Sequence, residues 1–300
     1  PVSTSPVRAY LGGFIVLGIS SSIAGPALSH LRDRVGTTNG GIASVVAANA
    51  LGYIIGSLGA GRLVDRGNAH RWWAIALAVA VASMLVVAEA PNLLVLLVAF
   101  AAMGATGGLA DVAGNTLVVW SRHGRATSLL NGLHLCFALG ALVTPVLVAR
   151  SLDWFHSLWA VAIPTGVIAA VCAARMITRP EPERSLPPPV AEGDRHPRAR
   201  SSQLASVCVF FFLYVAMESG VAVWIHTYVE EVDPGGPATG VTVAFWAGFV
   251  AGRMIAIAVG TRIGAGRIVG SSMVVALAAM GGIVGFGRTG TALLVLVILY

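Results

Sequence analysis

The chain has 300 residues, of which 56% are hydrophobic and only 11% are charged. Soluble domains carry about 25% charged residues, so this composition and a mean hydropathy of +0.82 exclude an ordinary soluble protein. The net charge of +6 comes from arginine alone, without interleaved aromatic residues, and predicts no nucleic-acid partner. The three cysteines lie apart in apolar runs, so neither a disulfide framework nor a metal site is expected.

Apolar stretches of about 20 residues, enough to cross a bilayer, follow one another along the chain. The predicted spans are residues 9–31, 35–61, 72–88, 92–120, 126–149, 154–174, 204–229, 239–260 and 268–287. The first contains Gly25-Pro26, a break that is typical of a cavity-lining helix. Residues 289–300 are apolar but too short to cross, and the chain begins with Pro1. We therefore expect a piece of a longer protein that stops within a tenth span.

A segment rich in proline and arginine, residues 178–202, predicts a solvated linker. It separates an N-terminal half of six spans, residues 1–177, from a partial C-terminal half, residues 203–300. A shift of 196 residues relates the halves: it aligns Gly52 with Gly248, Tyr53 with Phe249, Gly56 with Gly252, Arg66 with Arg262, and Arg71 with Arg267. Because an even number of spans separates the copies, the two halves are expected to be parallel.

Arginine also predicts the orientation. With the N-terminus inside, 14 of the 19 basic residues fall in cytoplasmic segments and 4 in outside loops, and Arg253 lies within a span. We therefore expect a multi-pass protein of the cell's inner (plasma) membrane. The N-terminus and residues 178–202 would be cytoplasmic, and Glu230, Glu231 and Asp233 would lie outside.

The loop between the second and third spans carries a recognisable motif. Gly61, Leu63, Asp65, Arg66 and Arg71 match the G-x-L-x-D-R-x-G-R-K pattern of the major facilitator superfamily, which this loop resembles. Asn68 stands in place of the second glycine, and Ala69 in place of a basic residue. The resemblance implies an all-α integral membrane fold with two parallel six-helix halves. It also implies a conformational latch at Gly61, Asp65, Arg66 and Arg71, because a helix N-terminus attracts a carboxylate. The alternative is an ordinary charged loop.

The fourth and fifth spans carry polar residues at helical spacing. Asp111 and Asn115 lie four residues apart on one face, and Asn131 and His134 lie three apart on the next span. A carboxylate in hydrocarbon costs at least about 2.5–3.5 kcal/mol, which predicts that Asp111 faces a cavity or a partner. Because these residues have similar depths, they could form one polar cluster for substrate or proton handling. A structural hydrogen-bonding pair inside the bundle is the alternative.

The seventh and eighth spans carry a second set of candidates. Tyr214 and Glu218 are four residues apart, and an acid near the middle of the bilayer is a functional hypothesis by default. Trp224 and Trp246 are further candidates, although Trp224 could instead belong to an interfacial belt. Arg253 either pairs with Glu218 or another acid, or extends toward the inner surface.

Together these stretches resemble the sodium-dependent glucose transporter family, which is related to the fucose–proton symporter branch. The resemblance rests on Asp-x-x-x-Asn at Asp111, Leu-His before Phe-x-x-Gly at Phe137, and Leu-Tyr-x-x-x-Glu at Tyr214. It implies cation-coupled transport of a hexose-like sugar, on whose ring Trp224 and Trp246 could stack. Thr116 stands where the symporters have proline, and residues 9–31 lack their first-span acid, so the coupling ion, H⁺ or Na⁺, stays open.

We therefore expect a secondary active transporter that works by alternating access, binds a small-molecule solute, functions as a monomer in the lipid bilayer and needs no cofactor. Export of drug-like or metabolic compounds is the alternative within transport. A membrane enzyme would need catalytic residues such as H-E-x-x-H or G-x-S-x-G, which the sequence lacks. A receptor or scaffold is the remaining class, and only a transporter would accumulate solute in sealed vesicles.

Overall fold

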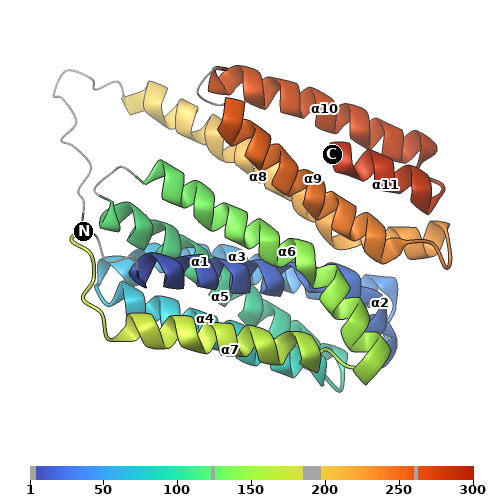
Figure 1. Ribbon diagram of the computed structural model, residues 1–300, viewed down its shortest axis with the longest axis horizontal. Coiled ribbons are helices and arrows are strands. Elements are labelled where there is room, and N and C mark those ends of the chain that lie inside the picture. The colour runs from blue at the N-terminus through green and yellow to red at the C-terminus, as the bar shows by residue number, and fades with distance from the viewer. Residues whose placement is uncertain (1–4, 123–125, 185–196, 260–262) are drawn as a thin grey trace.

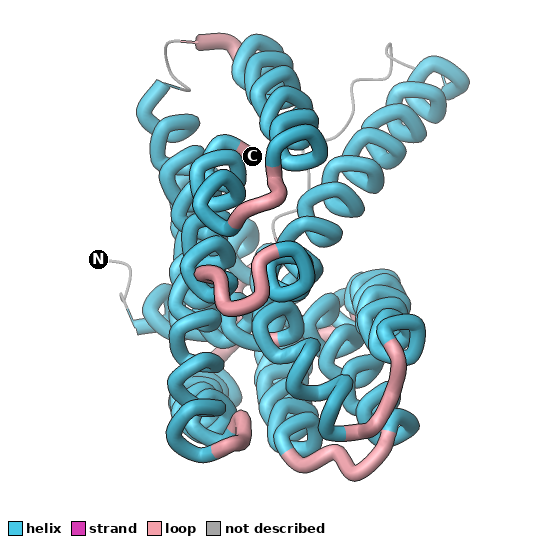
Figure 2. The backbone as a smooth tube through the Cα atoms, turned by 90° about the vertical axis from the view of Figure 1, so that its right-hand side faces the viewer, coloured by secondary structure: helices cyan, strands magenta, loops and turns pink. Residues whose placement is uncertain are grey.

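The computed structural model describes residues 5–122, 126–184, 197–259 and 263–300. Within these ranges the chain forms helices and loops, with no strand (Figure 2). The helices are α1 (Ser5–Ser22), α2 (Ala24–Arg34), α3 (Asn39–Asp65), α4 (Ala69–Ala88), α5 (Leu93–Ser121), α6 (Thr127–Phe155), α7 (Trp159–Ile177), α8 (Pro197–Val232), α9 (Ala238–Val259), α10 (Ala265–Phe286) and α11 (Gly290–Leu299).

The predicted membrane spans are confirmed. In the described part of the chain, eight helices are long and apolar enough to cross a bilayer, and nine if the bent pair α1 and α2 counts as one span. The two helices of that pair meet at 44°, close to the predicted break at Gly25-Pro26. α11 is apolar but shorter than a span. The helices lie side by side in two groups, α1–α7 and α8–α11 (Figure 1).

The internal repeat extends over three helices of each group. The 196-residue shift that aligns Gly52 with Gly248 also carries α3 onto α9, α4 onto α10 and the start of α5 onto α11, within a few residues at each boundary. The packing repeats as well, since a Cβ at Gly52 would overlap the Ala101 carbonyl on α5 and one at Gly248 would meet the Ile298 carbonyl on α11. The halves are therefore parallel copies of one arrangement.

The two halves touch at one end of the bundle and diverge at the other (Figure 1). We call the end where α7 stops and α8 starts the linker end, and the opposite end the far end. Toward the far end, Ile225 and Val229 of α8 are buried, and Gly25 of α2 lies against the α8 backbone. Toward the linker end, side chains of α8 such as Phe212 are exposed. The bundle is therefore open toward the linker end.

A carboxylate joins three helices of the first half at the far end. Glu89, just after α4, accepts hydrogen bonds from Arg34 Nη2 at 2.6 Å, from Ser157 Oγ at 3.1 Å and from the Trp159 indole. The Arg34 hydrogen bond, followed by the Trp159 and Ser157 bonds, lowers the pKa of this carboxyl below its ordinary value. Glu89 therefore fixes α2 and the start of α7 against the end of α4.

This geometry predicts an acid-sensitive contribution to stability. A carboxyl whose pKa is lowered by folding stabilises the folded state above its ordinary pKa, and that contribution disappears as the pH falls through the lowered value. We expect Glu89→Gln to lower the melting temperature of the detergent-purified protein at neutral pH. We expect the difference from the unmodified protein to shrink as the pH falls below about 4 and to vanish once the pH is below the lowered pKa of Glu89. A difference that persists unchanged at pH 3 would contradict this role.

Candidate functional site

The first polar cluster joins α3 and α5. Asp111 lies within α5, and the Asn115 amide one turn later donates to Asp111 Oδ1 at 2.8 Å. The other carboxylate oxygen, Oδ2, accepts a hydrogen bond from the Tyr53 hydroxyl of α3 at 2.7 Å. We call these three residues the Asp111 cluster. Each oxygen of this partly buried carboxylate therefore has its own donor, which offsets much of the cost of placing it within a span.

The second polar cluster lies in the other half. Glu218 of α8 is next to Tyr214 one turn earlier, and within electrostatic reach of Arg253 on α9 and Tyr300. The Arg253 guanidinium lies 4.9 Å from the centre of the Phe249 ring, a cation–π contact. Arg253 Nε and Tyr300 Oη are buried without a hydrogen-bond partner among the described residues. This Glu218 cluster thus holds two donors that no described residue uses.

His134 lies between the two clusters. It is on α6, within electrostatic reach of both Asp111 and Arg253, and its ring stands edge-on to Phe14 with ring centres 6.0 Å apart. Asn131, one turn earlier on α6, is partly buried, and no hydrogen bond joins it to the described residues. Of the four residues placed in one predicted cluster, the structure directly joins Asp111 with Asn115 and brings His134 near them.

The two candidate tryptophans lie where the halves meet. Trp224 of α8 packs against the apolar core that α1, α2 and α5 form near the far end. Trp246 of α9 is 5% exposed, and its ring meets Phe137 of α6 edge-on with centres 6.4 Å apart. In this conformation both rings fill the contact between halves, so their stacking on a sugar stays a prediction.

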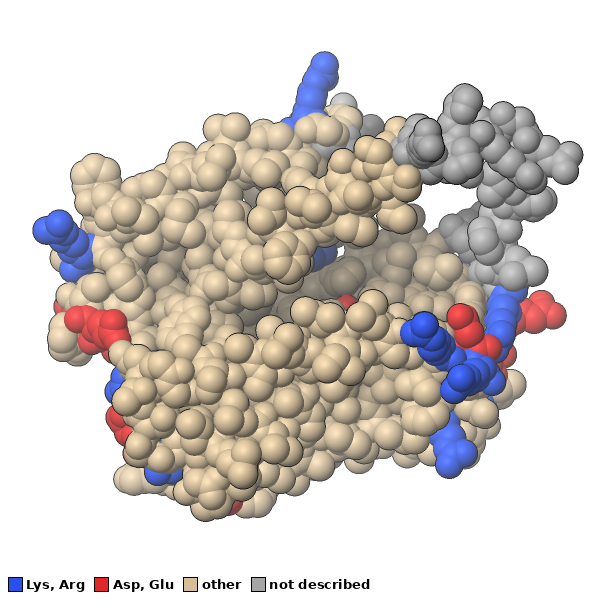
Figure 3. Space-filling model, turned by 180° about the vertical axis from the view of Figure 1, so that it is seen from behind, with Lys and Arg blue, Asp and Glu red and all other residues tan. Residues whose placement is uncertain are grey.

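A hollow separates the halves on the face seen in Figure 3. Its walls are uncharged, and both basic and acidic atoms show within it. Three charged residues inside the described spans, Asp111, Glu218 and Arg253, come from both halves. An apolar cleft with a few convergent polar groups is the usual form of a small-molecule site.

The predicted latch residues lie at the linker end. α3 ends at Asp65, and the turn into α4 places Gly67 and Asn68 in the left-handed region, with φ of +95° and +63°. Asparagine tolerates that conformation better than other residues with a side chain, which explains how Asn68 can replace the expected glycine. Gly61, Asp65, Arg66 and Arg71 are exposed, and no side-chain hydrogen bond or ion pair joins them to the described residues. Their latch function stays a prediction.

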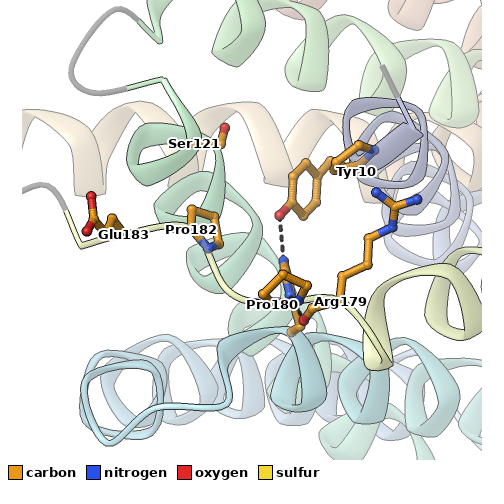
Figure 4. Close-up of a pocket in the computed structure, with 8 residues that line it drawn as sticks. Tyr10, Ser121, Arg179, Pro180, Pro182 and Glu183 are labelled. Carbon is orange, nitrogen blue, oxygen red and sulfur yellow. Dashed lines mark hydrogen bonds between the residues drawn. The ribbon is translucent and has the colours of Figure 1, made fainter. Parts of the chain in front are cut away.

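A separate cavity of about 300 Å³ opens at the linker end of the first half (Figure 4). Tyr10 and His70 form part of its wall, joined by a 2.7 Å hydrogen bond. The segment after α7 covers them, because Glu181 accepts a hydrogen bond from the His70 backbone and the Arg179 carbonyl lies 3.3 Å from His70 Nδ1. The first residues of the predicted linker therefore pack on the N-terminal half, while residues 197–202 already belong to α8.

Contacts between halves close the far end. Ser29 of α2 donates a hydrogen bond to Glu230 of α8, and Asn39 of α3 donates to Glu231 Oε1 at 3.2 Å. Arg32 Nη1 in turn donates to Asn39 Oδ1 at 2.8 Å. We call these five residues the far-end contact. The sequence predicted an acidic segment here but not its partners, since hydrogen bonds between distant helices leave no spacing signal.

The fold and the site together define a class: a multi-span helical membrane protein whose parallel halves enclose polar residues at mid-span. The sequence profile of the Major Facilitator Superfamily matches residues 10–300. The chain belongs to this superfamily.

Curated relatives share low but extended similarity. The chain is 23% identical to sodium-dependent glucose transporter 1A of Mus musculus over 297 residues, which is 85% of this chain and 69% of that protein. It is 25% identical over 303 residues to sodium-dependent glucose transporter 1 of Homo sapiens, covering 85% of this chain and 57% of that protein. The Xenopus laevis protein of that name is 23% identical, and this chain spans 55% of its length.

Solved structures confirm the fold. A D-xylose-proton symporter superposes with a TM-score of 0.72 at 14% identity, covering 100% of this chain and 79% of the other. The inward open xylose transporter XylE from E. coli gives 0.71 at 15% identity, covering 98% and 77%. A fucose transporter, FucP, in the outward conformation gives 0.63 at 17% identity, covering 98% and 81%.

Proposed function

We propose that the protein is a secondary active transporter of a small polar solute, a hexose-like sugar, coupled to H⁺ or Na⁺. The observation that carries this proposal is the pair of acids, Asp111 and Glu218, one in each half of a bundle that is open at one end. A coupled acid changes charge or binds a cation, so its energy differs between inward-facing and outward-facing states, as alternating access requires.

Two further observations support a sugar as the solute. The unused donors Arg253 Nε and Tyr300 Oη, with nearby Tyr214, are the kind of group that binds hydroxyl oxygens. The curated relatives are named as sodium-dependent glucose transporters, and solved neighbours as xylose and fucose symporters. We assign substrate or coupling functions to Asp111, Asn115, Asn131, His134, Tyr214, Glu218, Trp224, Trp246 and Arg253.

The open linker end gives the proposed orientation. The arginine distribution supports a cytoplasmic linker end, so this conformation would be inward-facing, with the far-end contact closing the outside. A latch at Asp65 would act when the linker end is closed, and here that residue has no partner among the described residues. The transporter would act as a single chain in the cell's inner (plasma) membrane.

Uptake by the full-length protein in sealed proteoliposomes tests this proposal. Labelled hexoses are offered under an imposed proton gradient and then under a sodium gradient. Accumulation that needs one gradient identifies a sugar symporter and its ion. The absence of hexose accumulation under either gradient would overturn the sugar assignment.

The far-end contact makes a separate prediction about conformation. We expect the double variant Glu230→Gln, Glu231→Gln to open the far end more often, because two hydrogen bonds between halves are weakened. If each weakened bond loses about 0.7 kcal/mol, the two together lose about 1.4 kcal/mol, so the rate at which an impermeant maleimide labels Val221→Cys from the far face should rise about tenfold. The exposed Cys208 is first replaced with serine.

Glu183→Gln serves as the control, because Glu183 is exposed at the opposite end of the bundle. Equal labelling rates in the double variant and in this control would show that the far-end contact does not hold the outside closed.

A further inference from the structure

Tyr53 is a polar residue that the predicted site does not include. It lies on α3, in an otherwise apolar stretch, and its ring is 40% exposed. Its hydroxyl donates to Asp111 Oδ2 at 2.7 Å, while Asn115 occupies the other oxygen of the same carboxylate. Tyr53 therefore fixes the rotation of the carboxylate from a second helix, which Asn115, on the same helix as Asp111, does not.

Close packing fixes this hydrogen bond in register. A Cβ at Gly56 would overlap the Ala105 carbonyl, and one at Gly104 would overlap the Asn49 carbonyl. A Cβ at Gly108 would likewise overlap the carbonyl of Tyr53 itself. Because the two backbones touch on either side of Tyr53, its hydroxyl has little freedom to move away from Asp111.

The internal repeat shows that this hydroxyl is specific to the first half. The 196-residue shift places Phe249 at the position of Tyr53 and Arg253 at the position of Ser57. In the second half the Phe249 ring therefore lacks a hydroxyl, and the Arg253 guanidinium instead lies 4.9 Å from the centre of this ring. At this position of the repeat, the first half presents a hydroxyl donor to Asp111, whereas the second half presents the Arg253 cation.

We propose that Tyr53 is a positioning residue for cation coupling: it holds the Asp111 carboxylate in the orientation in which the coupling cation binds and leaves. This inference rests on the proposed transport function. It locates the cation step in the first half, at the Asp111 cluster, and leaves Glu218 and Arg253 to the solute. Among the described residues, His134 on α6 is within electrostatic reach of Asp111, and Arg253 on α9 is within electrostatic reach of His134.

The test is Tyr53→Phe in the full-length protein, because this variant keeps the ring and removes only the hydroxyl. We expect the cation concentration for half-maximal solute uptake to change about tenfold, since a hydrogen bond to a charged group is lost. A coupled proton would bind more tightly, because the carboxylate loses a donor, whereas a coupled sodium ion would bind more weakly to a misoriented carboxylate. The KM for the solute should stay within about twofold, because Tyr53 acts through Asp111.

Tyr228→Phe is the matched control. That hydroxyl lies near the far end and donates to the Gly287 carbonyl at 3.3 Å, outside both clusters. An unchanged cation dependence in Tyr53→Phe, or the same change in both variants, would overturn the proposal. A raised solute KM with unchanged cation dependence would also overturn it, because it would make Tyr53 a solute-binding residue.

A second measurement does not depend on transport. Infrared difference spectra recorded across a proton or sodium titration of the purified protein report the carboxyl band of Asp111, assigned by its loss in Asp111→Asn. We expect this band to shift in frequency and midpoint in Tyr53→Phe and to stay unchanged in Tyr228→Phe. If the unmodified protein accumulates no hexose, the proposed function fails, and these spectra still decide whether Tyr53 controls the carboxylate. An Asp111 band that is identical with and without the Tyr53 hydroxyl would refute the inference.

Discussion

Gly56→Val is expected to prevent stable folding. Gly56 is one of the glycines through which α3 and α5 touch, and a Cβ there would overlap the Ala105 backbone rather than a movable side chain. Overpacking of a dense core costs about 1–3 kcal/mol, and more where neither backbone can move. This glycine contact between α3 and α5 also holds Tyr53 against Asp111. Any Gly56→Val protein that does fold should therefore lose coupled transport as well.

Gly59→Val, on the same helix, is the control, because a Cβ there meets nothing within 4 Å. Size-exclusion profiles and melting temperatures of the detergent-purified variants measure the effect. If Gly56→Val is monodisperse and has the same melting temperature as Gly59→Val, then α3 and α5 are not in direct backbone contact at this position.

Glu218→Gln is expected to reduce gradient-driven solute accumulation to the level of empty vesicles. The substitution keeps the shape of the side chain and removes a charge that lies in electrostatic reach of Arg253 within the bundle. If Glu218 organises the solute site, the variant should lose solute exchange between the two sides of the vesicle as well as accumulation. If it carries the cation instead, exchange should persist while accumulation stops.

The two assays are run in parallel, with Glu183→Gln as a control for the same substitution on an exposed surface. Accumulation by Glu218→Gln at the unmodified rate would remove Glu218 from both functions. These functions would then be assigned to Asp111 or His134.

Much of the fold could be predicted from the sequence because bilayer-spanning helices have a fixed length and composition. The predicted break near Gly25-Pro26 lies at the bend between α1 and α2. The internal repeat, predicted from a few matched residues, also relates α4 to α10 and the start of α5 to α11. Hydropathy and internal repeats are properties of the sequence, so they can be identified without any knowledge of tertiary contacts.

The site was predicted less completely, because its hydrogen bonds join helices far apart in sequence. Spacing predicted that Asp111 and Asn115 share a helix face, and the structure joins them. Spacing says nothing about Tyr53, which is 58 residues away from Asp111. A usable signal was present: glycines four residues apart on both helices, at Gly52 and Gly56 and at Gly104 and Gly108, mark a seam, and Tyr53 lies within it.

The one-sided contact between halves has a mechanical consequence. A helix of 20 residues is about 30 Å long, so a rotation of about 10° about the far end would displace its other end by about 5 Å. The far end thus works as a fulcrum and the helices as lever arms. Substitutions at the fulcrum, such as at Ser29 or Asn39, would change the aperture at the opposite membrane surface without touching the Asp111 and Glu218 clusters. Turnover rate and solute selectivity would then be adjustable at separate places in the molecule.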